Sequence, residues 1–492
     1  MTLARASGES RCTGSGVKSR KDRQVEQDKT HNKAKTKQRE RRQVMARLNA
    51  CRGLAAMAGT SLALTLAACG GDGVASPGSA NVASCASTSS CPATGATPTG
   101  PAAAPLCPAS LDYSTVYTGG SGAGEFVKMQ FDTSAMTYRL QIIESPVPKA
   151  IKSVSPTRAG VTFTGKIAHL TSLPSAEQNR CALALQSAAP SDNASQAIVD
   201  PANPPVIFIG NGVAGGGIPG ATISFDGLLG FGVIPARTFP IYPVLAFAQT
   251  ETDFTKVAGT YNVLGYHQVP SGGALIGPVT NFAPATARTV ETLNADGSCT
   301  AGAGSCVTTG NPWTPRAQND GAFESSNASG TRRYPAFYSQ AITSGNASRA
   351  NGVLVVGKLN GALVPLLIRV GYAQVDSILS INVDDESGLA MLAPASKLSN
   401  AQLNGGYVGS GSDLVYTASI VQGNAVALID PLTMNARGGY QLDLTQATPG
   451  LVTTVDNSGT TGALISTGHV FAHLAGTGGG NPTFRVSVFA SP

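Results

Sequence analysis

Residues 206–220, VIFIGNGVAGGGIPG, run an apolar segment directly into a series of glycines and a proline. Gly210, Gly212 and Gly215 have the spacing of a dinucleotide-binding turn. Such a turn requires a helix immediately afterwards, because the helix N-terminus meets the pyrophosphate. The glycines that follow and Pro219 oppose a helix, and the next residues, ATISF, alternate like a strand. The stretch therefore predicts a strand, a glycine-rich loop and a second strand, with no nucleotide cofactor.

Glycines continue to separate short segments of the chain from about residue 107 onward. Short segments rich in Val, Ile, Thr, Tyr and Phe alternate between apolar and polar residues and are bounded by Gly, Asn or Asp. These segments are 124–132, 137–145, 160–170, 220–227, 352–373, 377–388, 412–430, 440–446 and 483–490. Short helices are expected around 174–188 and 394–402. The pattern predicts an all-β fold of tandem antiparallel β modules, barrel-like or sandwich-like, after a disordered N-terminal region.

A weak internal repeat suggests how the β modules divide. FTKVAGTYNVLGYH begins at Phe254, and LSNAQLNGGYVGSG begins 144 residues later. Each places a Gly and a Tyr before a strand pattern, although such openings are also common wherever a strand begins. Glycine and an aromatic on a first strand resemble lipocalin-like barrels, and we keep Tyr261 and Tyr407 as candidate ligand-binding residues. The predicted modules are β module 1 at 107–253, β module 2 at 254–397 and β module 3 at 398–492.

Charge is unevenly distributed along the chain. Residues 1–68 hold 15 Lys and Arg against 5 Asp and Glu, which leaves 19 against 23 in residues 69–492. The body is therefore mildly acidic and lacks the basic face that a nucleic-acid partner requires. The charged run at 18–42 is typical of a disordered segment, with a nucleic-acid arm as the alternative. We interpret residues 1–44 as a disordered or mis-assigned extension before a start at Met45.

Residues 45–68 have the layout of a signal peptide. Arg47 and Arg52 form a basic n-region. The apolar stretch 54–68 is shorter than the about 20 residues of a membrane-spanning helix. This arrangement predicts export from the cytoplasm, with a plain signal peptide and an incidental cysteine as the alternative reading.

The signal segment ends in Leu66-Ala67-Ala68-Cys69, which resembles the lipobox of bacterial lipoproteins. The resemblance implies cleavage before Cys69, a lipid on its sulfur and an acylated amine. Three acyl chains anchor a protein stably to a membrane. Because Gly70 follows in place of Asp, the resemblance also implies the outer membrane, on its periplasmic side or at the cell surface. The chain as a whole is similar in style to uncharacterised betaproteobacterial lipoproteins, and that group implies no activity.

The linker and the cysteines fit an exported protein. Residues 69–106 comprise the candidate lipidated Cys69 and a linker of Gly, Ala, Ser, Pro and Thr. Six cysteines follow, and their even number suggests three disulfides. Their spacing favours Cys85–Cys91 and Cys299–Cys306, which leaves Cys107–Cys181. A zinc site is the competing interpretation, but no C-x-x-C pair or nearby His supports it.

Candidate catalytic and metal-ligating residues are few. The body contains no G-x-S-x-G nucleophile elbow. His469 and His473 lie four residues apart but lack the Glu of a metalloprotease motif. We interpret them as two half-exposed strand histidines, with zinc binding as the alternative. The sequence therefore predicts no catalytic residue, no metal and no cofactor.

Three further features have a structural and a functional interpretation. The acidic group Asp384–Glu386 and the pair Glu251 and Asp253 are each read as solvated turns, with calcium binding and glycosidase chemistry as the alternatives. The segment 294–298, NADGS, predicts a hairpin turn. The lone Trp313, between two prolines, either stacks a sugar ring or fixes a loop.

Two function hypotheses follow. The first is a lipid-anchored envelope protein, with a binding or structural role, whose partners are the membrane and an unknown small ligand or envelope protein. The second is an envelope hydrolase that acts on a polymer or glycan. The hydrolase requires that two or more of six side chains converge in one pocket. These are His267, His469, His473, Glu251, Asp253 and Asp384.

Overall fold

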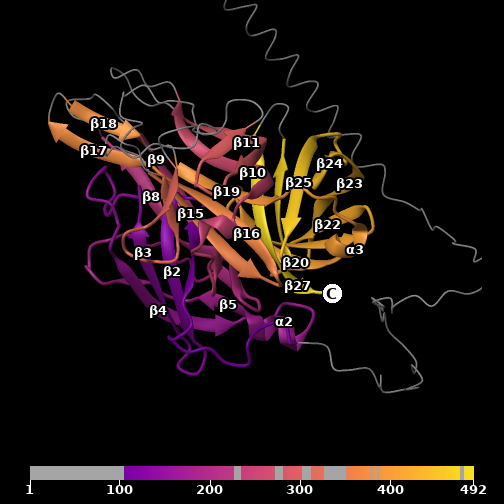
Figure 1. Ribbon diagram of the computed structural model, residues 1–492. Coiled ribbons are helices and arrows are strands. Elements are labelled where there is room, and N and C mark those ends of the chain that lie inside the picture. The colour runs from indigo at the N-terminus through magenta and orange to yellow at the C-terminus, as the bar shows by residue number, and fades with distance from the viewer. Residues whose placement is uncertain are drawn as a thin grey trace, which may run out of the picture. The chain divides into compact units, whose positions relative to one another are not determined.

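Antiparallel strands account for nearly all regular structure in the computed structural model (Figure 1). The structure describes residues 105–226, 234–271, 281–301, 312–325, 351–377, 380–384, 387–476 and 481–492. These all belong to the compact unit Thr99–Pro492. No helix in these ranges is long and apolar enough to cross a bilayer. The all-β prediction is confirmed.

The first sheet closes on itself. Its strands are β1 (Tyr117–Ser121), β2 (Glu125–Asp132), β3 (Thr137–Glu144), β4 (Thr162–His169), β5 (Ala182–Leu185), β6 (Ala189–Pro190), β7 (Val206–Ile209), β8 (Val213–Phe225) and β9 (Ile234–Phe247). They follow the order β3-β2-β1-β9-β8-β7-β5-β4-β6, and β3 also pairs with β4. That additional pairing closes the eight longer strands into a ring, and the two-residue β6 pairs with β4 outside it, so the sheet has no long unpaired edge.

The glycine-rich stretch forms a hairpin of the first sheet. β7 and β8 pair antiparallel around the turn at 210–212, so the two predicted strands are confirmed. The predicted glycine-rich loop is wrong beyond Gly212, because Gly215–Gly217 and Pro219 are paired residues of β8. Gly212 has a positive φ of 86°, a conformation that glycine adopts without strain. Gly215 faces the third sheet, where an added Cβ would lie 2.7 Å from Val488 Cγ1. The glycine at 215 therefore permits close packing between two sheets.

The second sheet is open in the described residues. It contains β10 (Gly259–Ser271), β11 (Asn281–Leu293), β12 (Cys299–Ala301), β13 (Trp313–Pro315), β14 (Phe323–Ser325), β15 (Asn351–Leu359), β16 (Ala362–Val370) and β19 (Ser387–Pro394). The strands β17 (Tyr372–Ser377) and β18 (Ser380–Asp384) form a separate pair. The 3₁₀ turn η1 (Phe254–Lys256) precedes β10. Residues 294–298 join β11 to β12, which confirms the predicted hairpin turn.

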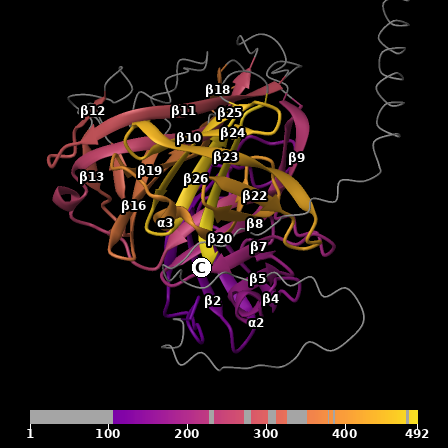
Figure 2. The same ribbon diagram turned by 90° about the vertical axis from the view of Figure 1, so that its right-hand side faces the viewer.

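The third sheet is a closed barrel of eight strands in sequence order. The strands are β20 (Gly405–Gly411), β21 (Tyr416–Gln422), β22 (Ala425–Ile429), β23 (Ala436–Thr448), β24 (Leu451–Asp456), β25 (Thr461–Thr467), β26 (Val470–Ala475) and β27 (Thr483–Ser491). The short helix α3 (Asn400–Leu403) precedes β20. The barrel strands β20 and β27 lie against β8 of the first sheet (Figure 2).

A large apolar cluster joins the three sheets. It includes Leu245 of β9, Ile368 of β16 and Val488 of β27, and all three side chains are buried. The barrel therefore uses both faces of its packed strands, one toward its own interior and one toward the neighbouring sheets. The predicted division into modules at 107–253, 254–397 and 398–492 stays a prediction, because strand pairing alone does not test independent folding.

A charged pair occupies the interior of the first sheet. Glu125 on β2 accepts from Arg158 Nε and Nη2 at 2.6 Å each, and both side chains are fully buried. Ser145 donates to the same carboxylate at 2.6 Å. Bidentate geometry and the added hydroxyl are what a buried ion pair needs to offset the loss of water. The pair is fully engaged within the protein and therefore has a structural role.

One helix prediction is partly wrong. The helix α2 covers Ala176–Cys181, with Ser175 and Gln178 forming a capping box. The chain then enters β5, whose four residues are all buried between β4 and β7. Complete burial of ALAL is possible in a covered sheet, whereas a surface helix of this length would leave one face exposed. The helix around 174–188 therefore ends at 181.

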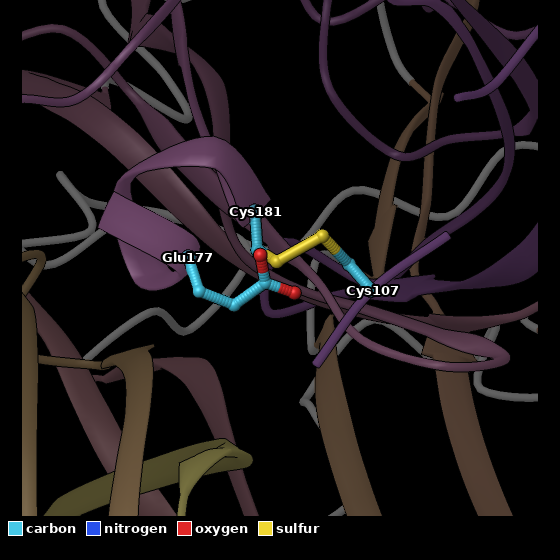
Figure 3. Close-up of side chains that lie close together, drawn as sticks. All are labelled: Cys107, Glu177 and Cys181. Carbon is cyan, nitrogen blue, oxygen red and sulfur yellow. A yellow bond between two sulfur atoms is a disulfide. The ribbon is translucent and has the colours of Figure 1, made fainter. Parts of the chain in front are cut away.

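The disulfide Cys107–Cys181 is confirmed (Figure 3). Glu177 lies beside it, and one ligand atom of each of the three residues is within 4.8 Å of the others. Because the two sulfur atoms are bonded to each other, neither is a thiolate available to a metal. Cys299 is also disulfide-bonded. Its predicted partner Cys306 lies outside the described residues, as do Cys85 and Cys91.

Candidate functional site

A cavity of about 500 Å³ opens at one end of the barrel β20–β27. We call it the barrel-mouth cavity. It is lined by Asp413, Thr417, Leu428, Arg437, Gly438, Gly439, Tyr440, Thr454, Asp456, Asn457, Ser458, Thr460, His473, Ala475, Thr483 and Arg485. Its volume lies within the range of about 300–1,000 Å³ found for small-molecule sites. Hydroxyl, amide and charged groups line it together with apolar surface from Leu428, Tyr440 and Ala475, so it is suited to a ligand that carries polar groups.

Strand alternation places these side chains inside the barrel. On β26, Phe471 belongs to the barrel's own core, whereas Ala472 and Leu474 belong to the cluster shared with other sheets. His473 therefore points inward with Phe471. The same alternation turns Arg485 inward on β27, between outward Phe484 and Val486.

The barrel interior is apolar at one end and polar at the other. The apolar core consists of Leu403, Tyr407, Val421, Val426, Tyr440, Leu442, Val452, Leu464 and Phe471. The polar residues Thr417, Thr454, His473 and Arg485 line the other end. Ser419 and Ser487 also point inward, but they pair with Tyr407 and Phe471 at the level of the apolar core. Polar residues are rarely buried without a hydrogen-bond partner or a function. The polar end is therefore the candidate functional site.

His473 is buried and held between two neighbours. Its ring stacks on Tyr440, with ring centroids 4.0 Å apart and an interplanar angle of 18°. Its Nε2 lies 3.0 Å from Thr454 Oγ1. Burial, and secondarily the positive charge of Arg485, lower the pKa of His473 to about 3. The imidazole is therefore neutral at pH 7, and it is too weakly basic for efficient general base catalysis at that pH.

Two arginines are fixed at the cavity wall by carboxylates. Arg485 Nη2 pairs with Asp413 Oδ2 at 2.6 Å. Arg437 Nη2 pairs with Asp430 Oδ2 at 2.6 Å, and its Nη1 donates to the carbonyl oxygen of Tyr416 at 3.1 Å. These contacts limit the motion of both guanidinium groups and reduce the entropy that each would lose on binding a ligand.

Three buried polar atoms inside the barrel lack hydrogen-bond partners among the described residues. They are Ser419 Oγ, Ser487 Oγ and Arg485 Nε. Ser419 lies two residues beyond the wall residue Thr417, and Ser487 two beyond Arg485, so both serines lie deeper along their strands. An unpaired buried polar group costs about 1–3 kcal/mol. Of these three residues only Arg485 lines the cavity, so a polar ligand there would provide a partner for its Nε.

The candidate ligand-binding aromatics are placed elsewhere. Tyr407 packs in the apolar end of the barrel between Phe471 and Phe489. Tyr261 is buried in the second sheet, and its hydroxyl donates to the carbonyl oxygen of Val257 at 2.7 Å. None of the lining residues of the barrel-mouth cavity is one of these two tyrosines.

Trp313 is a core residue of the second sheet and is only 6% exposed. It packs in a cluster with Phe254 and Phe323, and its amide donates to the carbonyl oxygen of Gly297 at 2.8 Å. This backbone hydrogen bond links the 294–298 turn to β13. A ligand-binding role for Trp313, Tyr261 and Tyr407 stays a prediction without a contact that favours it.

The interpretation of His469 and His473 as two half-exposed strand histidines is wrong. His469 is exposed in the turn before β26, with a φ of 65°, and lines a separate cavity of about 190 Å³ with Asn360 and Phe489. His473 is buried in the barrel-mouth cavity. His469 lies in the turn and has a positive φ, so the alternation of strand β26 does not extend back to it. A spacing of four residues therefore does not place the two rings on one face.

The acidic pair Glu251 and Asp253 has local partners. Glu251 accepts from the Asp253 amide at 3.0 Å and pairs with Lys358 at 3.0 Å. Asp253 caps η1 by accepting from the Thr255 amide. Neither residue lines the cavities that hold the two histidines. The side chains of His267 and of Asp384–Glu386 lie outside the described residues.

Ser419, Ser487 and Arg485 were not among the residues predicted from the sequence. Their signal was a polar residue at every second position within otherwise apolar strands, as in TASIVQ and FRVSVF. Such alternation normally marks a solvent face. Only barrel closure reveals that these polar positions point inward.

The fold and the cavity define an all-β protein with a closed barrel and a polar site in the barrel mouth. The chain belongs to the family described as "Protein of unknown function (DUF2957)", whose model matches residues 137–488. No match to a curated protein was found.

Two solved structures have a low similarity to the chain. Both are mutants of the vaccine antigen Transferrin Binding Protein B from Haemophilus parasuis Hp5. The single mutant is 10% identical, with a TM-score of 0.17. The double mutant is 9% identical, with a TM-score of 0.16. In each case the match covers 74% of this chain and 65% of the other. At these TM-scores the likeness supports no argument about fold or function.

Proposed function

We propose that this protein binds a small polar ligand in the barrel-mouth cavity. The observation that carries the proposal is the buried Nε of Arg485 in the cavity lining, which has no hydrogen-bond partner among the described residues. The neighbouring arginines are already oriented by carboxylates, so the site is largely formed before a ligand arrives. A binding role fits these groups better than catalysis, because the one histidine at the site is a weak base.

We further propose that the ligand is bound at the cell envelope. The lipobox-like sequence LAAC at Cys69 supports this, together with the linker to residue 106. The disulfide Cys107–Cys181 is consistent with an oxidising compartment. In this proposal the acylated Cys69 attaches the chain to the outer membrane, and the β-rich body presents the cavity to small solutes.

The binding proposal is tested with a variant that blocks the cavity. The full-length protein in detergent is equilibrated with a small-molecule extract of cells, and retained compounds are identified by mass spectrometry. Ala475→Trp places a large ring at the cavity wall, and Ala427→Trp places the same ring on the exposed outer face of the barrel. The proposal predicts a compound retained by wild type and Ala427→Trp and lost with Ala475→Trp. Equal retention by all three proteins, or retention by none, contradicts it.

The anchoring proposal has its own test. Cells that produce the wild type, Cys69→Ser or Cys51→Ser are labelled with radioactive palmitate and separated into membrane and soluble fractions. The expected result is label and membrane association for wild type and for Cys51→Ser, and loss of both for Cys69→Ser. Unlabelled wild-type protein would reject the lipid anchor and leave the cavity proposal intact.

A further inference from the structure

The positive charges of the barrel-mouth cavity are already compensated. Arg485 pairs with Asp413 and Arg437 pairs with Asp430, each with 2.6 Å between a guanidinium nitrogen and a carboxylate oxygen. An anion that displaced either aspartate would leave that carboxylate beside it in the same wall, where the two negative charges would repel each other. The two arginines therefore do not form a site for an anionic ligand.

The remaining acidic group of the lining is engaged within its own turn. Asp456 Oδ1 accepts from the Ser458 amide at 2.8 Å, from the Ser458 hydroxyl at 2.6 Å and from the Thr460 amide at 2.8 Å. Asp456 ends β24 at the surface of the barrel, where water screens its charge. The interior of the cavity therefore has charged groups but no uncompensated charge that would attract an ion.

One wall of the cavity is apolar. Leu428 on β22 and Tyr440 on β23 line it, and Gly438, two residues before Tyr440, pairs directly with Leu428. A Cβ added at Gly438 would have no heavy atom within 4 Å, so the space beside Leu428 is open. The C–H face of a ring can pack against such a wall.

The opposite wall is polar. β27 lies four strands from β23 in the closed eight-stranded barrel, so these two strands face each other across the interior. β27 contributes the Thr483 hydroxyl and the Arg485 guanidinium, whose Nε is buried with no partner in the described part of the chain. The Nε requires an acceptor oxygen, and a hydroxyl group provides one without bringing a charge.

We propose that the ligand is an uncharged hydroxylated ring, of the neutral-sugar class. Its C–H face packs on Leu428 and Tyr440, and its hydroxyl groups point toward Thr483 and Arg485. A charged ligand would lose its water on entry and would gain no unpaired opposite charge in return, which costs more than the transfer of hydroxyl groups. The inference rests on the proposed function, because it assumes that the barrel-mouth cavity is the ligand site.

Three probes of similar size test the charge of the ligand. They are D-glucose, the anion D-glucuronate and D-glucosamine, which is a cation at pH 6. Their binding to the full-length protein in detergent at pH 6 is measured by isothermal titration calorimetry. We expect glucose to bind at least about tenfold more tightly than either charged probe, because a buried charge without a partner costs more than about 1.4 kcal/mol. Its affinity should not change between low and high salt, since no charges pair on binding.

Two threonine variants locate the sugar. Thr483→Val removes a hydroxyl from the polar wall at the start of β27. Thr461→Val makes the same change at the exposed start of β25, outside the cavity lining. We expect Thr483→Val to weaken glucose binding about fivefold, since one neutral hydrogen bond is worth about 1 kcal/mol. Thr461→Val is expected to leave the affinity unchanged.

The possible outcomes separate this inference from the proposed function. Equal or tighter binding of glucuronate or glucosamine overturns the inference that the ligand is uncharged. Binding of none of the three probes also overturns it, and the retention experiment with Ala475→Trp then decides separately whether the cavity is a ligand site. Glucose binding that Thr483→Val does not weaken places the sugar away from the polar wall and rejects the proposed geometry.

Discussion

The imidazole of His473 lies flat against the ring of Tyr440 inside the barrel, 4.0 Å between centroids. The stack joins the polar end of the barrel to its apolar core, because Tyr440 belongs to that core. Thr454 Oγ1 engages His473 Nε2 and fixes the ring in the stack. A histidine in this setting is a neutral structural part of the cavity wall.

The neutral state of His473 predicts a specific pH dependence of stability. Its folded pKa of about 3 lies below the ordinary 6.5. Between these values the unfolded chain binds a proton that the folded chain excludes, so the stabilisation is complete above pH 6.5 and is lost as the pH falls. We expect the free energy of unfolding to decrease by up to about 1.4 kcal/mol per pH unit below pH 6.5.

Urea unfolding between pH 7 and pH 5 tests this dependence, because carboxyl groups with ordinary pKa values near 4 contribute less in that window. His473→Gln is expected to flatten the slope. His169→Gln, a change at an exposed histidine on β4, is expected to keep it. A slope that survives in His473→Gln would mean that another group titrates.

Removing the unpaired hydroxyl of Ser487 is expected to stabilise the empty protein. Alanine takes away a buried group that has no partner in the described residues and leaves a cavity smaller than a methyl group. The free energy of unfolding should rise by about 1 kcal/mol without ligand. Thermal and urea unfolding of the ligand-free protein provide the measurement. A clear loss of stability would show that Ser487 already has a partner, such as ordered water.

Close packing at Gly215 predicts a strong size limit. A Cβ at this position would lie 2.7 Å from Val488 Cγ1, nearer than van der Waals contact. Gly215→Val should therefore lower the free energy of unfolding by about 1–3 kcal/mol. Val488→Ala should recover part of this loss in the double variant, because it removes the clashing methyl groups. Additive losses in the double-mutant cycle would show that the two residues do not touch.

The disulfide Cys107–Cys181 links residues 74 apart in the sequence. Closing a loop of this length stabilises a fold by about 4 kcal/mol in the chain-entropy model. Replacing both cysteines with serine should lower the urea midpoint accordingly, with the other cysteines left in place. An unchanged midpoint would show that this disulfide does not stabilise the fold. It would also remove the support that the disulfide gives to export of the protein.

Several elements could be predicted from the sequence for clear physical reasons. β2 and β3 alternate apolar and polar residues around a turn, and the structure pairs them as a hairpin. β9 could not be predicted in the same way, because Pro235, Pro240 and Pro243 interrupt its pattern. β9 pairs with β1 only from Val244 onward, and the three prolines precede that residue. The edge of β9 that would face β1 is therefore unpaired at the prolines, so their missing amide hydrogens break no hydrogen bond to β1.

The site was harder to predict than the fold. VFAHLA of β26 reads as one apolar strand with an incidental histidine. Both of its faces are buried, because Ala472 and Leu474 pack on other sheets while Phe471 and His473 fill the barrel. Which face of the strand encloses a cavity depends on how strands that are far apart in sequence close into a barrel. The periodicity within one strand does not predict that closure.

Native mass spectrometry of the full-length protein, released from its own membranes in mild detergent, tests the account most directly. The account predicts a chain that begins at an acylated Cys69 and carries a small non-covalent adduct, with the adduct absent from Ala475→Trp and present in Ala427→Trp. A chain with a free Cys69 and no adduct in any of the three proteins would contradict both the anchor and the ligand site.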